Sequence, residues 1–483
     1  MCLIAGTVIL IGCSALSGTG IGSGAGTGMG SSAGAAALPA YKTTSTATVS
    51  VGPTSGLSLD STFAGFSYEK SILSEPLFDS GNKVLIQLFQ NLGPGILRIG
   101  GNSVNKTTWD PNGTGLTAGS TSPADVDRLA AFLRATGWRV IYGLNATTSS
   151  ASLSAAEAAY ASTSLGSQLY GFEIGNEPDL YASNGLKPST YDFSDFLSDW
   201  DSYSSAIETA VSGAVMTGPA AAYNYAAYTI PFASSEAKKI QLLTQHYYRA
   251  NGQSTTSTID LLLSPDPNLP KMLTALASAA SGNSIPDGYR LAEANSFYNG
   301  GAPGISDAFG SALWVVEFCF ALAENGATGV NFHGGGSGTG YTPIANDSEG
   351  NVLEARPEYY GMLLFSMMAK GALLTTEVSE TASALYAFAV GNENGGTSIV
   401  LLNNSRTDVV GVRVQMPQAV ASANALILTA PTLDSTSGET FGGSTIAPDG
   451  TWSATQTYQV PFQDSQLSLD VFSGSAILMQ VNQ

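Results

Sequence analysis

Apolar runs and helical stripes alternate along the middle of the chain. Eight near-continuous apolar runs predict buried strands: residues 63–69, 96–101, 139–145, 171–177, 214–219, 240–248, 288–295 and 329–335. Between the runs, apolar residues recur at helical spacing, as at Val126, Leu129 and Leu133. Pro123 in the first turn and Gly137 after the last turn mark the ends of that helix. Eight strand–helix units over residues 61–370 predict an α/β fold, a (β/α)8 TIM barrel.

From residue 371 to residue 483 the apolar period changes to two. Five runs alternate in this way: residues 384–390, 397–402, 409–414, 425–428 and 476–481. Turn-forming residues such as those at 392–396 separate them, and no helical stripe interrupts them. This part predicts a C-terminal antiparallel β-sandwich domain. Residues 44–60 contain another alternating run, which we expect to join the same domain.

The first 43 residues predict targeting and tethering, not a folded element. Residues 1–13 are apolar but too short to span a bilayer, and they resemble a signal segment. Residues 10–13 resemble a lipobox, in which Cys13 would carry a lipid anchor, and export without lipidation is the alternative. Residues 14–43 are rich in Gly, Ala and Ser and predict a flexible tether. We expect a secreted or cell-envelope protein, periplasmic or extracellular, without a transmembrane span.

Composition narrows the classes of ligand. The chain has 483 residues and a net charge of −19, which argues against nucleic acid because phosphates favour Lys and Arg. The same negative charge argues more weakly against a densely sulfated polymer as the ligand. Three cysteines form no disulfide or zinc pattern, and two histidines exclude a His-rich metal site. We therefore expect neither a metal nor another cofactor.

Polar and aromatic residues gather where the predicted strands end, which is where TIM barrels carry their active sites. They are Tyr68, Glu69, Arg98, Asn102, Asn145, Asn176, Glu177, Tyr223, His246, Tyr247, Tyr248, Glu293 and His333. Packing alone does not require such residues at strand ends that lie far apart in sequence. Tyr247 and Tyr248 point to opposite faces of their strand, so only one can point into the barrel.

Two glutamates at these ends predict glycoside hydrolysis. Glu177 ends the fourth predicted strand, and Pro178 favours extended backbone before it. Glu293 ends the seventh, between alanines small enough to leave room for a sugar. A retaining glycosidase needs two carboxylates about 5–5.5 Å apart, one as acid/base and one as nucleophile. Strand alternation places Glu173 deeper than Glu177, so we assign Glu177 as acid/base and Glu293 as nucleophile.

Arg98 has two interpretations. It could hold Glu293 ionised and oriented, because a guanidinium binds a carboxylate through fixed N–H groups. It could equally be a structural ion-pair residue. We interpret His246 as a structural histidine and Glu69 as a structural carboxylate.

Four motifs resemble glycoside hydrolase family 79, which contains bacterial and fungal β-glucuronidases and the heparanases. They are LRIGGN at 97–102, GNEP at 175–178, HYY at 246–248 and AEANSFYNGGAPGISDAF at 292–309. The resemblance spans residues 46–483 and implies the same acid/base and nucleophile. It further implies that Asn176 holds the sugar 2-hydroxyl and that Tyr248, Tyr298 and the backbone of Gly300 line the sugar site. Asn102 and His333 are further candidates for substrate binding.

A glycine-rich loop follows His333. The sequence HGGGSGTGY could place several backbone N–H groups around the carboxylate of a uronic acid, with Tyr341 as a phenolic donor. A flexible surface loop is the alternative. The chain lacks the basic clusters of heparanases, which favours an exo-acting enzyme over one with an open cleft.

Together these features predict a retaining exo-acting β-glucuronidase that removes terminal β-D-glucuronic acid from glycans or glucuronides. Another barrel-plus-sandwich glycosidase, such as an α-L-arabinofuranosidase, is one alternative. A non-catalytic polysaccharide-binding surface lipoprotein is a second alternative, although the presence of both glutamates speaks against it.

Overall fold

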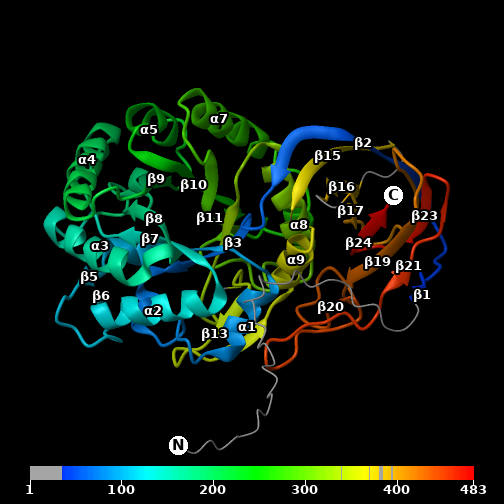
Figure 1. Ribbon diagram of the computed structural model, residues 1–483, viewed down its shortest axis with the longest axis horizontal. Helices are drawn as coiled ribbons and strands as arrows, with labels where there is room; N and C mark the ends of the chain where they lie inside the picture. Colours follow the sequence, from blue (N-terminus) through cyan, green and yellow to red (C-terminus); the bar gives the residue numbers. More distant parts are fainter. Residues whose placement is uncertain (1–34, 339, 369, 380–383, 393–394) are drawn as a thin grey trace, which may run out of the picture.

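The computed structural model describes residues 35–483 except 339, 369, 380–383 and 393–394 (Figure 1). The predicted signal segment, Cys13 and most of the predicted tether lie outside these residues. Within the predicted tether, β1 (Ala36–Ala37) pairs with β21 (Tyr458–Gln459), so the expectation of a tether is wrong there. No helix in the described part of the chain is both long enough and apolar enough to cross a bilayer.

Eight parallel strands close into a barrel, in the order β10-β11-β12-β3-β4-β7-β8-β9. Their bounds are β3 (Ala64–Glu69), β4 (Ile96–Gly100), β7 (Arg139–Leu144), β8 (Leu169–Ile174), β9 (Met216–Ala221), β10 (Ile240–Asn251), β11 (Tyr289–Tyr298) and β12 (Val330–Gly334). All eight correspond to predicted apolar runs. Both faces of such strands are covered, which is why the runs are nearly continuous.

Helices surround the barrel (Figure 1). The α-helices are α1 (Lys83–Asn91), α2 (Pro123–Thr136), α3 (Ala151–Leu165), α4 (Phe193–Ala210), α5 (Thr229–Glu236), α6 (Ile259–Leu262), α7 (Leu269–Gly282), α8 (Gly310–Glu324) and α9 (Pro357–Ser366). Helix α2 starts in a capping box formed by Ser122 and Asp125 and ends at Gly137, whose φ of 78° is left-handed. Both ends of α2 therefore match the sequence signals.

The second domain is one continuous mixed sheet beside the barrel (Figure 1). Its strands are β1, β2 (Ser45–Leu59), β15 (Gly371–Val378), β16 (Leu385–Gly391), β17 (Thr397–Asn403), β18 (Val410–Gln415), β19 (Ser422–Thr429), β20 (Thr440–Phe441), β21, β22 (Phe462–Gln463), β23 (Gln466–Val471) and β24 (Ser475–Asn482). Ala425 of β19 and Leu469 of β23, which lie toward opposite ends of the strand order, share one core. The sheet therefore curls so that its ends pack together as in a sandwich.

Two details of the second domain differ from prediction. The sheet is not wholly antiparallel, because β2 pairs with β18 in parallel as well as with β15 in antiparallel orientation. The strands β15 and β23 were not among the predicted runs, although their burial also alternates. Residues 44–60 join this sheet, as the alternation of β2 indicates. Phe320 of α8 stacks on Phe388 of β16, with ring centroids 4.4 Å apart, and joins the sheet to the barrel.

Short elements extend the barrel loops. They are the pair β5 (Thr108–Trp109) and β6 (Ser120–Thr121), the pair β13 (Ile344–Asn346) and β14 (Val352–Ala355), and the 3-10 turns at Lys70–Ser74, Asn102–Asn105, Gly166–Gln168 and Pro178–Leu180. Two of these turns follow β4 and β8: the first begins with Asn102 and the second directly follows Glu177, two residues of the candidate site described below.

Candidate active site

Arg98 connects two carboxylates inside the barrel mouth. Its Nε donates to Glu173 at 2.6 Å, and its Nη1 donates to Glu293 at 2.7 Å. Its Nη2 donates to Asn176 Oδ1 at 2.8 Å. Arg98 is fully buried, and burial by itself would lower the pKa of its guanidinium. The negative charges of Glu173 and Glu293 outweigh this effect and raise that pKa. The contacts of Arg98 are consistent with both interpretations, because it binds Glu293 and also forms a buried ion pair with Glu173.

Both oxygens of Glu293 accept a hydrogen bond. Oε2 accepts from Arg98, and Oε1 accepts from the Tyr248 hydroxyl at 2.9 Å. His333 Nδ1 lies 3.6 Å from Oε2 and 3.0 Å from Ser67 Oγ. Only 4% of Glu293 is exposed. Strands β4, β10 and β12 thus place Arg98, Tyr248 and His333 around the Glu293 carboxylate.

The surroundings of Glu293 keep it ionised. Burial by itself would raise the pKa of this carboxyl, but His333, His246 and Arg98, together with the Tyr248 hydrogen bond, lower the pKa to about 2. These partners therefore favour the ionised form of the Glu293 carboxyl. An ionised, oriented and partly desolvated carboxylate suits attack on an electrophilic carbon.

Glu177 lies beyond the end of β8, not within it. The strand stops at Ile174, Gly175 has a φ of 74°, and Glu177 has left-handed backbone with φ 54° and ψ 56°. The expectation of extended backbone before Pro178 is therefore wrong, and the strand alternation that we extended to Glu177 does not reach it. A hydrogen bond from the Glu177 amide to Ala220 O, 2.9 Å long, compensates the cost of this conformation.

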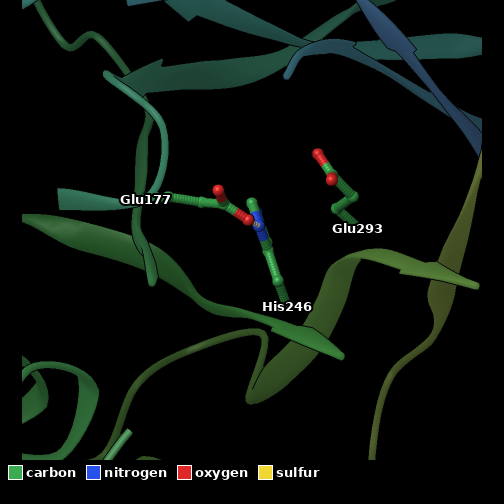
Figure 2. A group of neighbouring side chains, drawn as sticks. All are labelled: Glu177, His246 and Glu293. Atoms are coloured by element: carbon green, nitrogen blue, oxygen red, sulfur yellow. Dashed lines mark hydrogen bonds and ion pairs between the residues drawn. The ribbon is translucent and has the colours of Figure 1, made fainter. Parts of the chain in front are cut away.

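His246 holds the side chain of Glu177. Its Nδ1 lies 3.1 Å from Glu177 Oε1, and both residues are buried. Figure 2 shows His246 beside the carboxylate of Glu177, with Glu293 across from them. The expectation of a purely structural histidine overlooked this contact. An imidazole in this place can fix the orientation of the carboxylate in either protonation state.

Glu177, His246 and Glu293 form one cluster. One side-chain atom from each can be chosen so that all lie within 4.8 Å of one another. At least one carboxylate oxygen of Glu177 thus lies within 4.8 Å of one of Glu293, and the double displacement of a retaining glycosidase needs such a close approach of two carboxyl groups. Two carboxylates and an imidazole at this spacing are also a possible ligand set for a metal ion. The Arg98 guanidinium, which already binds Glu293, disfavours a second cation there.

The predicted sugar-binding residues lie around this cluster at different depths. Asn176 is buried and held by Arg98, and its Nδ2 donates to Asn102 Oδ1 at 3.4 Å. Tyr341 packs against Tyr248 with ring centroids 5.9 Å apart. Tyr298, the last residue of β11, is 45% exposed and lies at the rim.

The loop after β12 is bound to its neighbours. Gly340 N donates to Gly300 O at 2.7 Å, which links this loop to the loop after β11. Gly335 N donates to Thr342 Oγ1 and Gly336 N donates to Asn346 Oδ1, both at 2.8 Å. These three N–H groups already have partners, so the expected cradle of free amides is wrong for them. Tyr341 is buried beside Tyr248, and its hydroxyl stays a candidate donor of this loop.

The sequence analysis did not identify three residues of the site as functional: Ser67, Glu173 and Asn295. Ser67 binds His333, and Glu173 binds Arg98 and accepts from the Thr244 hydroxyl at 2.8 Å. Asn295 Nδ2 donates to His333 O and Tyr341 O, both at 2.9 Å. Period-two spacing within strands was the only available signal for these residues, and it is shared by every inward position.

The chain is similar to known glycosidases in sequence and in fold. No family model matches the chain. A protein named β-glucuronidase from Aspergillus niger is 26% identical over 400 residues, which cover 73% of this chain and 72% of that protein. A second β-glucuronidase, from Neurospora crassa, is 26% identical over 226 residues, 41% of this chain and 39% of that protein.

Solved structures share the architecture. A 4-O-α-L-rhamnosyl-β-D-glucuronidase from Fusarium oxysporum superposes with a TM-score of 0.75 at 16% identity, covering 89% of this chain and 99% of that one. A family 51 α-L-arabinofuranosidase from Bifidobacterium longum gives a TM-score of 0.67 at 13% identity, covering 91% and 100%. At these identities the likeness shows the fold, and the predicted barrel with a second sheet domain is confirmed.

Proposed function

We propose that this protein is a retaining, exo-acting β-glucuronidase of glycoside hydrolase family 79. The observation that carries the proposal is the cluster of Glu177, His246 and Glu293 within 4.8 Å at the barrel mouth. The two relatives named β-glucuronidase support the glucuronide as substrate and the glycoside hydrolase class.

In the first step, Glu293 attacks the anomeric carbon of a terminal β-glucuronide. Glu177 gives its proton to the glycosidic oxygen, so the leaving group departs as a neutral alcohol. The product is a glycosyl ester on Glu293. Arg98 and Tyr248 hold the attacking carboxylate, and their donors constrain its direction of attack.

In the second step, Glu177 takes a proton from water. The water oxygen attacks the anomeric carbon, and the bond to Glu293 breaks, which releases glucuronic acid with retained β configuration. His246 keeps Glu177 in place through both proton transfers. No cofactor enters the proposed reaction.

The link between the loops after β11 and β12 supports exo action. The hydrogen bond between Gly340 and Gly300 joins them on the side of the mouth that carries Glu293. We propose that Tyr341, His333 and Tyr298 meet the glucuronic acid there, together with the Gly300 backbone. Asn176 and Asn102 would bind its hydroxyl groups from the opposite loop.

The test is to measure hydrolysis of an aryl β-glucuronide and, in parallel, of an aryl α-L-arabinofuranoside. The second substrate tests the alternative assignment as an arabinofuranosidase. We expect turnover of the glucuronide and release of the β-anomer in an NMR time course. Glu293→Gln should abolish turnover while leaving binding of glucuronic acid. Near wild-type activity of this variant, or initial release of the α-anomer, would contradict the double displacement.

Glu177→Ala separates the acid/base from the nucleophile. An aryl glucuronide with a good leaving group needs little protonation, so part of its turnover should survive, and azide should restore more. A glucuronide with a poor leaving group should lose nearly all turnover. Equal loss on both substrates would contradict the role of Glu177.

We also propose that the protein is exported to the cell envelope or beyond. It would be either secreted or held at the membrane by a lipid on Cys13. The apolar segment at 1–13 supports this proposal. Fractionation of expressing cells tests it, and Cys13→Ser tests the lipid. Recovery of the full-length protein in the cytoplasm alone would contradict export.

A further inference from the structure

An exposed tyrosine lies on the loop next to the acid/base. Tyr223 follows β9, which neighbours the strand before Glu177, and 70% of its surface is exposed. Its ring makes no contact with another aromatic ring in the described part of the chain. Exposed tyrosines are common, so exposure alone does not indicate a binding site.

The backbone that carries Tyr223 is held unusually firmly. The carboxylate of Asp179 accepts the amides of Ala222, Tyr223 and Asn224 at 2.8, 3.1 and 3.0 Å. Gln245 Nε2 donates to Ala221 O at 2.7 Å. Three N–H groups on one carboxylate fix the loop far more strongly than an ordinary exposed turn.

The same contacts tie this loop to Glu177. Asp179 lies two residues after Glu177, and the Glu177 amide donates to Ala220 O, three residues before Tyr223. Glu177 must reach the glycosidic oxygen to protonate it. The leaving group begins at that oxygen and therefore extends away from Glu293 on the side of Glu177.

We propose that Tyr223 is the stacking platform of a leaving-group subsite and selects aglycones that present a ring. This inference rests on the proposed glucuronidase function. A tyrosine offers a large rigid face at low conformational cost, because only two torsions must be fixed. The ring of a neighbouring sugar and an aryl ring share the chemistry that this face recognises. Methyl as aglycone is too small to use it.

The test compares three substrates: a β-glucuronyl disaccharide, phenyl β-glucuronide and methyl β-glucuronide. Tyr223→Ala should lower kcat/KM by about three- to tenfold on a ring-bearing substrate and leave methyl glucuronide within about twofold. Comparing the loss of kcat/KM on the disaccharide with the loss on phenyl glucuronide shows whether a sugar ring or an aryl ring binds better to Tyr223. Tyr223→Phe keeps the ring face and should retain wild-type values.

Tyr41→Ala is the matched control, since Tyr41 is also an exposed tyrosine, at 41%, but belongs to the second domain. It should change none of the three values. Equal loss on all three substrates in Tyr223→Ala, or no loss on any, would overturn the subsite and leave the glucuronidase function intact. No turnover of any substrate by the wild-type protein would overturn both.

Discussion

Removing one hydroxyl from Tyr248 tests how the site holds its nucleophile. The Tyr248 hydroxyl donates to Glu293 Oε1 at 2.9 Å, and the opposite oxygen accepts from Arg98. Tyr248→Phe deletes only the first of these bonds. The ring keeps its contact with Tyr341, so the shape of the site is preserved.

The expected cost follows from the charge of the acceptor. A hydrogen bond to an ionised group contributes about 1.5–3 kcal/mol. Because a tenfold rate change corresponds to about 1.4 kcal/mol, kcat/KM should fall about 10- to 150-fold if the bond is fully used in the transition state. The loss should appear mainly in kcat, since Tyr248 acts on the reacting carboxylate.

The pH profile gives an independent readout. Tyr248 is one of the groups that keep the pKa of Glu293 at about 2. Its hydroxyl stabilises the ionised carboxylate, so its removal raises that pKa. The acid limb of kcat/KM that reports Glu293 should therefore move to higher pH in Tyr248→Phe, measured on an aryl glucuronide.

Tyr247→Phe is the matched control for this change. Tyr247 is the adjacent residue, its ring stacks on Phe318 outside the barrel, and its hydroxyl donates to Asp266 at 2.9 Å. The control loses a hydroxyl of the same kind, so its melting temperature should fall, while kcat/KM and the pH profile should stay unchanged. Equal kinetic effects of the two variants would refute the role of Tyr248.

Three further changes test the surrounding network. Glu173→Gln leaves Arg98 with one fewer buried counter-charge, so it should lower both the melting temperature and kcat/KM. The free energy of unfolding measured in urea titrations should fall by about 3–5 kcal/mol, and unchanged stability would contradict this prediction. His246→Phe should impair poor leaving groups more than good ones, because His246 holds Glu177, and uniform loss across a leaving-group series would count against this. Since the pKa of Glu293 is lowered from 4.5 to about 2, its ionisation stabilises the fold fully above pH 4.5 and ceases to do so near pH 2. The melting temperature of the wild type minus that of Glu293→Gln should therefore decrease as the pH falls through this window, and an increase would be inconsistent with the lowered pKa.

The local signals in the sequence were sufficient for the barrel. Apolar runs and capped stripes such as Pro123–Thr136 depend on neighbours a few residues apart, so they can be read without the fold. They also singled out Glu177, just beyond the end of β8, and Glu293, although Glu293 lies in the middle of β11 and does not end that strand as expected. Tyr247 and Tyr248 show the same logic, because strand alternation alone requires their opposite directions.

Tertiary structure decided what each of these residues contacts. The left-handed backbone at Glu177 depends on Ala220, which comes from another strand, and the contact of His246 with Glu177 joins residues 69 positions apart. The glycine-rich pattern at Gly335 and Gly336 did not reveal that Thr342 and Asn346 would bind their amides, because side-chain partners several residues away depend on how the loop folds. Sequence patterns determine which face of an element is buried. Only closure of the barrel brings distant groups close enough to form hydrogen bonds and ion pairs, and those contacts keep Glu293 ionised and orient both glutamates.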